Sequence, residues 1–316
     1  MSPIVLLDSQ KLSSEFKEAL EDHLKNQNWD FISYPTTTTL ETIEKRCANC
    51  EVILVNKDIL KEDHFKLLPK LKYILVIATG YDNVDVLAAK KYGIKVSNIP
   101  DYSTLIVAQH TIALLLELTN HVGNSNYLVK KENKWYGIGD KHLELTGLTL
   151  GIFGFGRIAQ QVIKIAIALG MNIIVSSRKN DYTTNLPIKF VDKKTIFKES
   201  DIISLHCPLN NETKYLVNKD TLALMKTNVF LINTARGSLI NETDLYNALV
   251  NKQIKGAALD VLIQEPADPL NPLLKIDNCI ITPHKAWISE NSLQRWLNEI
   301  GECIKHFFNN RFINLV

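Results

Sequence analysis

Short apolar runs alternate with amphipathic stretches along the first third of the 316-residue chain. The amphipathic stretches, such as residues 14–24 and 84–92, carry apolar side chains at helical spacing, and Gly93 is placed to end the second. The apolar runs predict short buried strands at residues 4–7, 31–33, 52–55, 74–78 and 95–96. Strands that alternate with helices in this way predict a small doubly wound domain with a parallel sheet.

The same alternation begins again after the Ile99-Pro100 break and an apolar helix expected over residues 103–118. Its strands are predicted at residues 149–153, 173–176, 189–191, 202–206, 229–233, 257–261 and 279–282. A last helix, residues 289–308, follows this series, and we expect it to return to the first domain. The sequence therefore predicts an α/β fold with two doubly wound domains. They are a Rossmann-type dinucleotide-binding domain, residues 100–287, and a discontinuous flavodoxin-like substrate domain, residues 1–99 plus 288–316.

A glycine-rich turn, GIFGFGRIA at residues 151–159, joins one predicted strand to a predicted helix. Gly154 would allow the tight turn, and Gly156 would let the backbone approach a pyrophosphate at the positive end of the helix. Ala159 is small enough to stand in for a third glycine. An ordinary strand-to-helix turn is the alternative, but both flanking elements favour dinucleotide binding. We expect the buried helix face to consist of Ile158, Val162, Ile165, Ala166 and Leu169.

The residues after the next strand bear on the choice of nicotinamide cofactor. NAD-selective domains carry an acid there, about 20 residues past the glycines, that binds the ribose 2′-hydroxyl. Here the chain has Ser177, Arg178 and Lys179, which could bind a 2′-phosphate by hydrogen bonds and charge. A solvated basic turn is the alternative. The pattern predicts that NADP (as NADPH) is preferred, with NAD possible.

Three later strands are each followed by a residue of catalytic type, namely Arg236, Glu265 and His284. The carboxyl ends of parallel strands share one edge of a sheet, so these side chains can converge. Arg236 would bind a carboxylate, His284 would exchange a proton with a carbonyl oxygen, and Glu265 would orient the imidazole and favour its charged form. Taken singly, each has another explanation: Arg236 could pair with a surface acid, His284 could cap a helix, and Glu265 could begin a solvated proline turn. Together they indicate redox chemistry on 2-keto or 2-hydroxy acids.

Composition and charge limit the other classes of function. The chain is 46% apolar and 22% charged, with a formal net charge of +2, which argues against nucleic acid or an anionic membrane as partner. The beginning of the chain has no signal-peptide pattern, and the apolar stretch at residues 105–118 is too short to span a bilayer. We therefore expect a cytoplasmic protein. Cys47 and Cys50 could form half a zinc site or a redox pair, but free thiols are favoured and no metal is expected.

The helix expected around residues 106–118 is apolar nearly all round. Such a helix has too little polar surface to face water, so it is either a buried hinge helix or part of a subunit interface. The two interpretations are compatible. We favour a homodimer that acts on a small-molecule 2-keto or 2-hydroxy acid.

Over nearly its whole length the chain resembles the D-isomer-specific 2-hydroxyacid dehydrogenases. The matching segments are ATGYDNVD at residues 78–85, VAQHT at 107–111, the glycine loop, HCPL at 206–209, NTARG at 233–237, LDV at 259–261, EP at 265–266 and PH at 283–284. The resemblance implies a catalytic trio of Arg236, Glu265 and His284.

The same resemblance implies further contacts to cofactor and substrate. Asp260 would bond the nicotinamide carboxamide, and Arg157 and Ile158 would lie along the pyrophosphate. The backbone at Ala78, Thr79 and Gly80 would receive the substrate carboxylate, as a glycine-containing turn can. The residues that would line the cofactor groove are His206, Cys207, Pro208, Thr213, Thr234 and Ala235.

Within the family, segments such as PHKAW at residues 283–287 are most similar to glycerate dehydrogenases, also called hydroxypyruvate reductases. Trp287 would form one wall of the substrate pocket. Lys285 stands where the family usually has an aliphatic residue, and it bears on the choice of substrate. The resemblance therefore favours reduction of hydroxypyruvate or glyoxylate to the D-2-hydroxy acid. Alternatives are another D-2-hydroxyacid dehydrogenase of the D-lactate or phosphoglycerate type, and a non-enzymatic, NAD(P)-sensing corepressor-like protein. The complete trio favours an enzyme.

Overall fold

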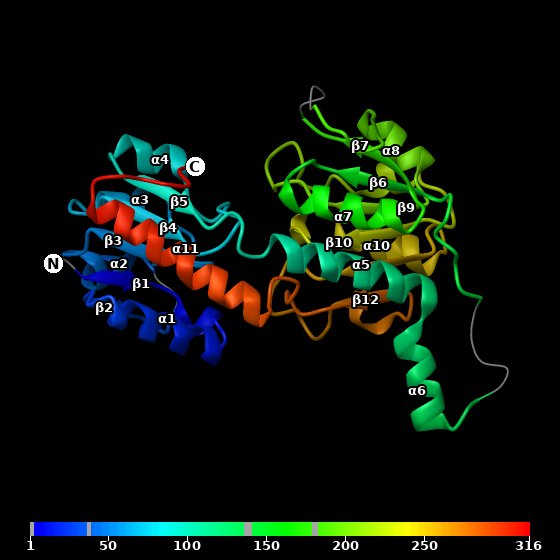
Figure 1. Cartoon of the computed structure of the whole chain (residues 1–316), viewed down its shortest axis with the longest axis horizontal. Helices are drawn as coiled ribbons and strands as arrows, with labels where there is room; N and C mark the ends of the chain where they lie inside the picture. The colour runs from blue at the N-terminus through cyan, green and yellow to red at the C-terminus, as the bar shows by residue number, and fades with distance from the viewer. Residues whose placement is uncertain (1–2, 37–38, 136–140, 179–182) are drawn as a thin grey trace. The chain divides into compact units, whose positions relative to one another are not determined.

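The computed structural model, shown in Figure 1, describes residues 3–36, 39–135, 141–178 and 183–316. The chain forms two compact units, one of Met1–Ser103 with Ile288–Val316 and the other of Thr104–Trp287. The first unit extends slightly beyond the boundary expected at residue 99. Tyr102, whose side chain is buried, is tied to this unit because its carbonyl oxygen accepts a hydrogen bond from Nε of Arg295 at 2.8 Å.

The first unit contains a five-stranded sheet in the order β2-β1-β3-β4-β5, with every pair parallel. This is the strand order of flavodoxin-like doubly wound folds. The edge strand β2 is only half-buried, although the sequence predicts a buried strand, because it has a neighbour on one side alone. The strands are β1 (Ile4–Leu6), β2 (Phe31–Ser33), β3 (Val52–Val55), β4 (Tyr73–Val76) and β5 (Lys95–Asn98).

The last helix of the chain, α11, returns to the first unit as the sequence predicts. It packs against α1 and β4, and Nε1 of its buried Trp296 donates to the carbonyl oxygen of Ile77 at 2.7 Å. The N-cap of α2 is Thr39, in a capping box with Thr42. The helices are η1 (Ser9–Lys11), α1 (Ser14–Asn26), α2 (Leu40–Cys47), α3 (Glu62–Lys66), α4 (Val86–Lys91) and α11 (Glu290–Phe308).

The second unit contains a seven-stranded sheet in the order β12-β11-β10-β9-β6-β7-β8, again wholly parallel. The order reverses between β6 and β9, as in Rossmann folds, with one further strand at the edge. That reversal is where a doubly wound sheet binds its ligand. The strands are β6 (Thr149–Phe153), β7 (Asn172–Ser176), β8 (Ile188–Phe190), β9 (Ile202–Leu205), β10 (Phe230–Asn233), β11 (Gly256–Leu259) and β12 (Cys279–Ile281).

Two helices of this unit differ from the sequence prediction. On α7 the buried face consists of Ala159, Val162, Ile163 and Ala166, whereas Ile165 is 37% exposed, so the predicted face was set slightly too far round the helix. Helix α6 was not predicted, and none of its residues is buried. The helices are α5 (Thr104–Asn120), α6 (Val122–Glu132), α7 (Arg157–Ala168), α8 (Lys193–Glu199), α9 (Lys219–Leu222), η2 (Gly237–Leu239), α10 (Glu242–Val250) and η3 (Pro272–Lys275).

The apolar helix α5 is accounted for by burial within the second unit. It packs against α7, β10 and β11, and Figure 1 shows it beside α7. Only Leu105 among its large apolar side chains is strongly exposed. In the part of the chain that the structure describes, no single helix has the length and apolar character to cross a membrane. The α5–α6 pair meets that test only when joined across a 59° bend. All five cysteines are free, and Cys47 and Cys50 are buried.

Candidate active site

Three adjacent strands of the second unit bring the predicted catalytic residues to one edge of the sheet. Arg236, Glu265 and His284 follow β10, β11 and β12, which are neighbours in this order. Backbone hydrogen bonds continue beyond the strands: the N–H of Asp260 donates to the carbonyl oxygen of Asn233 at 2.9 Å, and that of His284 to the carbonyl oxygen of Asp260 at 2.8 Å. The three loops therefore form one connected platform.

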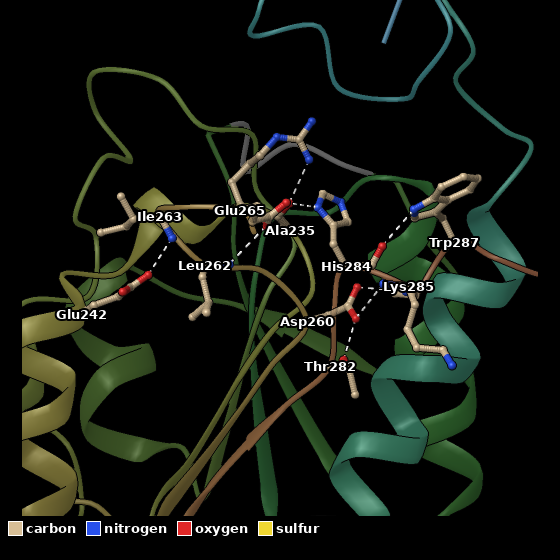
Figure 2. A network of polar contacts seen from close by, with 12 residues as sticks. Ala235, Glu242, Asp260, Leu262, Ile263, Glu265, Thr282, His284, Lys285 and Trp287 are labelled. Atoms are coloured by element: carbon tan, nitrogen blue, oxygen red, sulfur yellow. Dashed lines mark hydrogen bonds and ion pairs between the residues drawn. The ribbon is translucent and has the colours of Figure 1, made fainter. Parts of the chain in front are cut away.

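His284 and Glu265 make a direct side-chain contact, which Figure 2 shows. Nδ1 of His284 lies 2.6 Å from Oε2 of Glu265, and both side chains are about 30% exposed. Oε1 of the same glutamate accepts from the backbone N–H of Leu262 at 3.2 Å. Since Nδ1 is engaged by the carboxylate, Nε2 of His284 is the nitrogen left for a ligand. His284 therefore pairs with Glu265 and does not cap a helix, whereas residues 263–266 around Glu265 do form an exposed turn.

The loop that carries Arg236 is shaped by its own polar groups and by a glycine. The side chain of buried Asn233 accepts from the N–H of Ala235 at 3.0 Å and donates to the carbonyl oxygen of Arg236 at 2.8 Å. A Cβ at Gly237 would lie 2.0 Å from the carbonyl carbon of Leu262, so only glycine fits there. The Arg236 loop therefore lies directly against the backbone that leads to Glu265.

Asp260 is a buried carboxylate that holds the loop of His284. It accepts hydrogen bonds from Oγ1 of Thr282 at 2.5 Å and from the backbone N–H groups of Lys285 and Ala286 at 3.0 and 2.9 Å. Burial raises the pKa of Asp260, but hydrogen bonds from His110, Thr282 and these two N–H groups outweigh it and keep the pKa below its ordinary value. His284 itself has a φ of +49°, so its backbone needs this support.

Two neighbours of His284 differ in what they contribute. Nε1 of Trp287 donates to the carbonyl oxygen of His284 at 3.0 Å, which places the indole on the same loop. The side chain of Lys285 is exposed and points away from the His284 ring in Figure 2. Lys285 therefore supports the loop with its backbone N–H, which donates to Asp260, and not with its charged side chain.

The glycine loop has the geometry that a dinucleotide requires. Gly154 has a φ of +96°, and a Cβ there would lie 2.6 Å from the carbonyl oxygen of His206, so the turn packs against the end of β9. Gly156 begins α7 with no side-chain cap, and a Cβ there would meet nothing within 4 Å. The space beside Gly156 at the N-terminus of α7 is therefore open, which fits a pyrophosphate bound there. Arg157 is exposed and Ile158 is partly buried.

Other predicted cofactor residues lie at the same edge of the sheet. Ser177 and Arg178 directly follow β7, and Arg178 is exposed; Lys179 lies outside the described residues. After β9, Nε2 of His206 lies 2.8 Å from Oγ of Ser204, and desolvation lowers the pKa of His206 to about 4. The ring is therefore neutral at physiological pH.

The remaining groove residues are held by short local contacts. Burial raises the pKa of the Cys207 thiol to about 11. Oγ1 of Thr213 donates to the carbonyl oxygen of Pro208 at 2.7 Å, so Thr213 shapes the loop after β9. Oγ1 of Thr234, next to Ala235, lies 3.0 Å from Oγ1 of Thr111 on α5. Each of these groove residues follows β9 or β10 at its carboxyl end.

The predicted carboxylate site belongs to the first unit. Ala78, Thr79 and Gly80 follow β4 and are half-buried. Nδ2 of Asn98 donates to the carbonyl oxygen of Thr79 at 2.7 Å, and Oγ1 of Thr79 donates to that of Ile99 at 3.1 Å. The turn is therefore well ordered within its own unit.

Sequence reasoning missed several residues that shape this site. Oε1 of Glu242, at the start of α10, accepts from the N–H of Ile263 at 2.5 Å, and its Oε2 accepts from Asn271 at 2.8 Å. His110 and Thr282 also belong to the network around Asp260; His110 lies in the matching VAQHT segment, but no role was assigned to it from sequence. No periodicity or spacing marks them, because their partners are distant in sequence. Across the described ranges, no cluster of three or more His, Cys, Asp or Glu could hold a metal ion.

Comparisons with known proteins agree with this geometry. Residues 112–286 match the family model "D-isomer specific 2-hydroxyacid dehydrogenase, NAD binding domain". The chain is 40% identical over 286 residues to hydroxypyruvate reductase of Blautia hydrogenotrophica, covering 88% of each chain. It is 34% identical over 322 residues to glycerate dehydrogenase of Methylorubrum extorquens, covering 99% of this chain and 98% of that one. Among solved structures, an acyclic imino acid reductase (Bsp5) in complex with NADPH and D-Arg has a TM-score of 0.89, 30% identity and 99% coverage of both chains.

Proposed function

The chain belongs to the D-isomer specific 2-hydroxyacid dehydrogenase family, and we propose that it reduces hydroxypyruvate or glyoxylate to the D-2-hydroxy acid with NADPH. The family's reaction is oxidoreduction at a CH–OH group with a nicotinamide cofactor. One observation carries the proposal: the 2.6 Å contact between His284 and Glu265, on the loops beside Arg236. Relatives named hydroxypyruvate reductase and glycerate dehydrogenase support a short substrate.

The chain's own residues supply proton transfer and charge stabilisation. Bound NADPH supplies a hydride to the carbonyl carbon of the keto acid. His284, held through Nδ1, gives the proton on Nε2 to the keto oxygen and takes it back in the reverse reaction. Glu265 fixes the orientation of the ring through its contact with Nδ1.

A positively charged side chain and backbone N–H groups bind the substrate. The guanidinium of Arg236 provides a rigid set of donors for the carboxylate and the keto oxygen. In the first unit, the N–H groups of Thr79 and Gly80 are the proposed donors to the substrate carboxylate, since turns of this kind bind anions. Both assignments follow the positions that match the family's motifs.

The cofactor is assigned to the carboxyl edge of β6, β7 and β9. The turn at Gly154 and Gly156 receives the pyrophosphate on the first turn of α7. Ser177 and exposed Arg178 suit a 2′-phosphate, and neither repels it as an acid would. The similar imino acid reductase, which was solved with NADPH, supports this preference.

Loss of NADPH absorbance tests the proposal directly, with hydroxypyruvate, glyoxylate, pyruvate, phenylpyruvate and 3-phosphohydroxypyruvate supplied in turn. We expect the first two to have the highest kcat/KM. His284→Ala should lower kcat by about a hundredfold or more while the Kd of NADPH stays within twofold. His306→Ala, on α11 in the first unit, is the matched control. Equal turnover by His284→Ala and the wild type would overturn the assigned proton donor, and no turnover of any keto acid would favour a non-enzymatic NADPH-binding protein.

A homodimer is the proposed assembly, and helix α6 supports it. Val122 and Tyr127 on this helix, and Trp135 beyond it, are 62%, 54% and 68% exposed. An exposed apolar surface of this kind commonly marks a protein interface. Sedimentation equilibrium should give a dimer that Val122→Ser combined with Tyr127→Ser weakens; a wild-type monomer at micromolar concentration would contradict it. The cytoplasmic location stays a prediction from sequence.

A further inference from the structure

Two consecutive residues of α5, His110 and Thr111, touch the two loops that carry His284 and Arg236. Nε2 of His110 lies 3.1 Å from Oγ1 of Thr282, at the start of the His284 loop. Oγ1 of Thr111 lies 3.0 Å from Oγ1 of Thr234, in the Arg236 loop. We propose that His110 and Thr111 are positioning residues that brace the catalytic loops against α5. This inference rests on the proposed function.

The hydrogen-bond directions in the first contact are fixed by chemistry. Thr282 has one hydroxyl proton and donates it to the ionised carboxylate of Asp260 at 2.5 Å. Its oxygen can therefore only accept from His110. Nε2 of His110 also lies 3.5 Å from Oδ1 of Asp260, which is another acceptor. Nε2 must therefore carry a proton, and the chain of donation runs from His110 to Thr282 to Asp260.

The second contact has the opposite direction. Thr111 donates its single hydroxyl proton to the carbonyl oxygen of Val107 at 2.8 Å, within its own helix. The hydroxyl of Thr234 must then donate to Thr111. One α5 residue thus gives a hydrogen bond to the His284 loop, and the next receives one from the Arg236 loop.

Helix α5 is suited to be a rigid support. Thr111 is buried, as are Ala108, Ile112 and Leu115, and the helix packs against α7, β10 and β11. The catalytic loops, by contrast, project beyond their strands, where loops are ordinarily mobile. A displacement of about 1 Å in a catalytic group can cost up to about a hundredfold in rate. Tying both loops to a buried helix limits that displacement.

The two braces predict different kinetic effects. His110→Leu removes the donor to Thr282 and should lower kcat about tenfold, with the KM of the keto acid within twofold. Thr111→Val removes the acceptor for Thr234 and should raise that KM about fivefold, since Arg236 binds substrate. His110→Gln places an amide Nε2–H near the lost imidazole donor and should recover most of kcat. Gln109→Leu, an exposed position on the same helix, is the matched control.

A double-variant cycle shows whether His110 acts through Thr282. We expect His110→Leu combined with Thr282→Val to lose no more than the larger single loss, because both remove the same hydrogen bond. Multiplied losses, an unchanged kcat in His110→Leu, or a His110→Gln variant as slow as His110→Leu would overturn the brace. If His110→Leu does not fold, His110→Asn, one methylene shorter than glutamine, replaces it with the same expected loss.

Nitrogen NMR of the imidazole rings separates this inference from the proposed function. The geometry requires His110 to keep its proton on Nε2 whenever the ring is neutral. A neutral His110 protonated only on Nδ1 would overturn the brace even in an active enzyme. If the wild type reduces no keto acid but Nε2 of His110 is protonated, the brace geometry stands and the proposed function fails.

Discussion

Nδ1 of His284 and Oε2 of Glu265 lie 2.6 Å apart, although the two residues follow different strands, β12 and β11. A contact this short between an imidazole and a carboxylate fixes which ring nitrogen faces the ligand. Glu265 can act on the ring in two ways, as a hydrogen-bond acceptor and as a negative charge, and a variant can tell the two apart.

The variant Glu265→Gln tests that separation. The substituted amide can still accept from Nδ1 of His284 but carries no negative charge, so we expect kcat for keto acid reduction to fall about tenfold to a hundredfold. The Kd of NADPH, measured by fluorescence, should not change. Glu242→Gln changes a nearby carboxylate, which accepts from the N–H of Ile263, and controls for general damage to this edge of the sheet. A wild-type kcat in Glu265→Gln would mean that the carboxylate charge is not used.

Cofactor preference should follow the residues after β7. Ser177→Asp combined with Arg178→Ala introduces an acid for the ribose 2′-hydroxyl and removes a cation that suits the 2′-phosphate. We expect the ratio of kcat/KM for NADPH over NADH to fall by about a hundredfold or more. Arg157→Ala, at the pyrophosphate end, should affect both cofactors alike. A ratio that barely moves would contradict the assignment of Ser177 and Arg178.

The two glycines of the turn should respond differently to alanine. Gly154 has a φ of +96° and a backbone oxygen 2.6 Å from the added Cβ, so Gly154→Ala should lose about 2 kcal/mol or more of unfolding free energy. Gly156→Ala meets nothing within 4 Å and should keep its stability but raise the Kd of NADPH, because its Cβ enters the space proposed for the pyrophosphate. Urea unfolding and cofactor titration distinguish the two effects. The reverse pattern would refute this placement of the cofactor.

Stability in mild acid should depend on His206. The pKa of His206 falls from 6.5 to about 4 in the folded protein, so between these values the unfolded chain binds a proton that the folded chain does not. The unfolding free energy should therefore be fully present above about pH 7 and decrease as the pH falls, by up to about 2 kcal/mol at about pH 5. His206→Gln, which cannot titrate, should lack this share of the decrease. Parallel pH profiles for the two proteins would contradict the lowered pKa.

The glycine turn and the catalytic trio could be predicted because their signals are local. Gly154 and Gly156 stand between an apolar run and a helical pattern, and Arg236, Glu265 and His284 each follow a strand that the apolar pattern marks clearly. Helix α6 gave no such signal, since it buries no face and therefore has no apolar periodicity. The misplaced face of α7 has a different cause: apolar residues, among them Ile163, Ile165 and Ile167, lie on more than one side of this helix, and Ile165 was assigned to the buried side.

From the order of its residues alone, this chain specifies two alternating α/β series and the residue types at the ends of the strands, because periodicity and turn chemistry act over a few neighbours. Tertiary structure alone decides how those residues are held. Asp260 accepts hydrogen bonds from Thr282, Lys285 and Ala286. His110 and Thr111 of α5 contact the two catalytic loops. Such contacts join positions separated by many residues, and they exist only once parallel strands have placed those positions at the same edge.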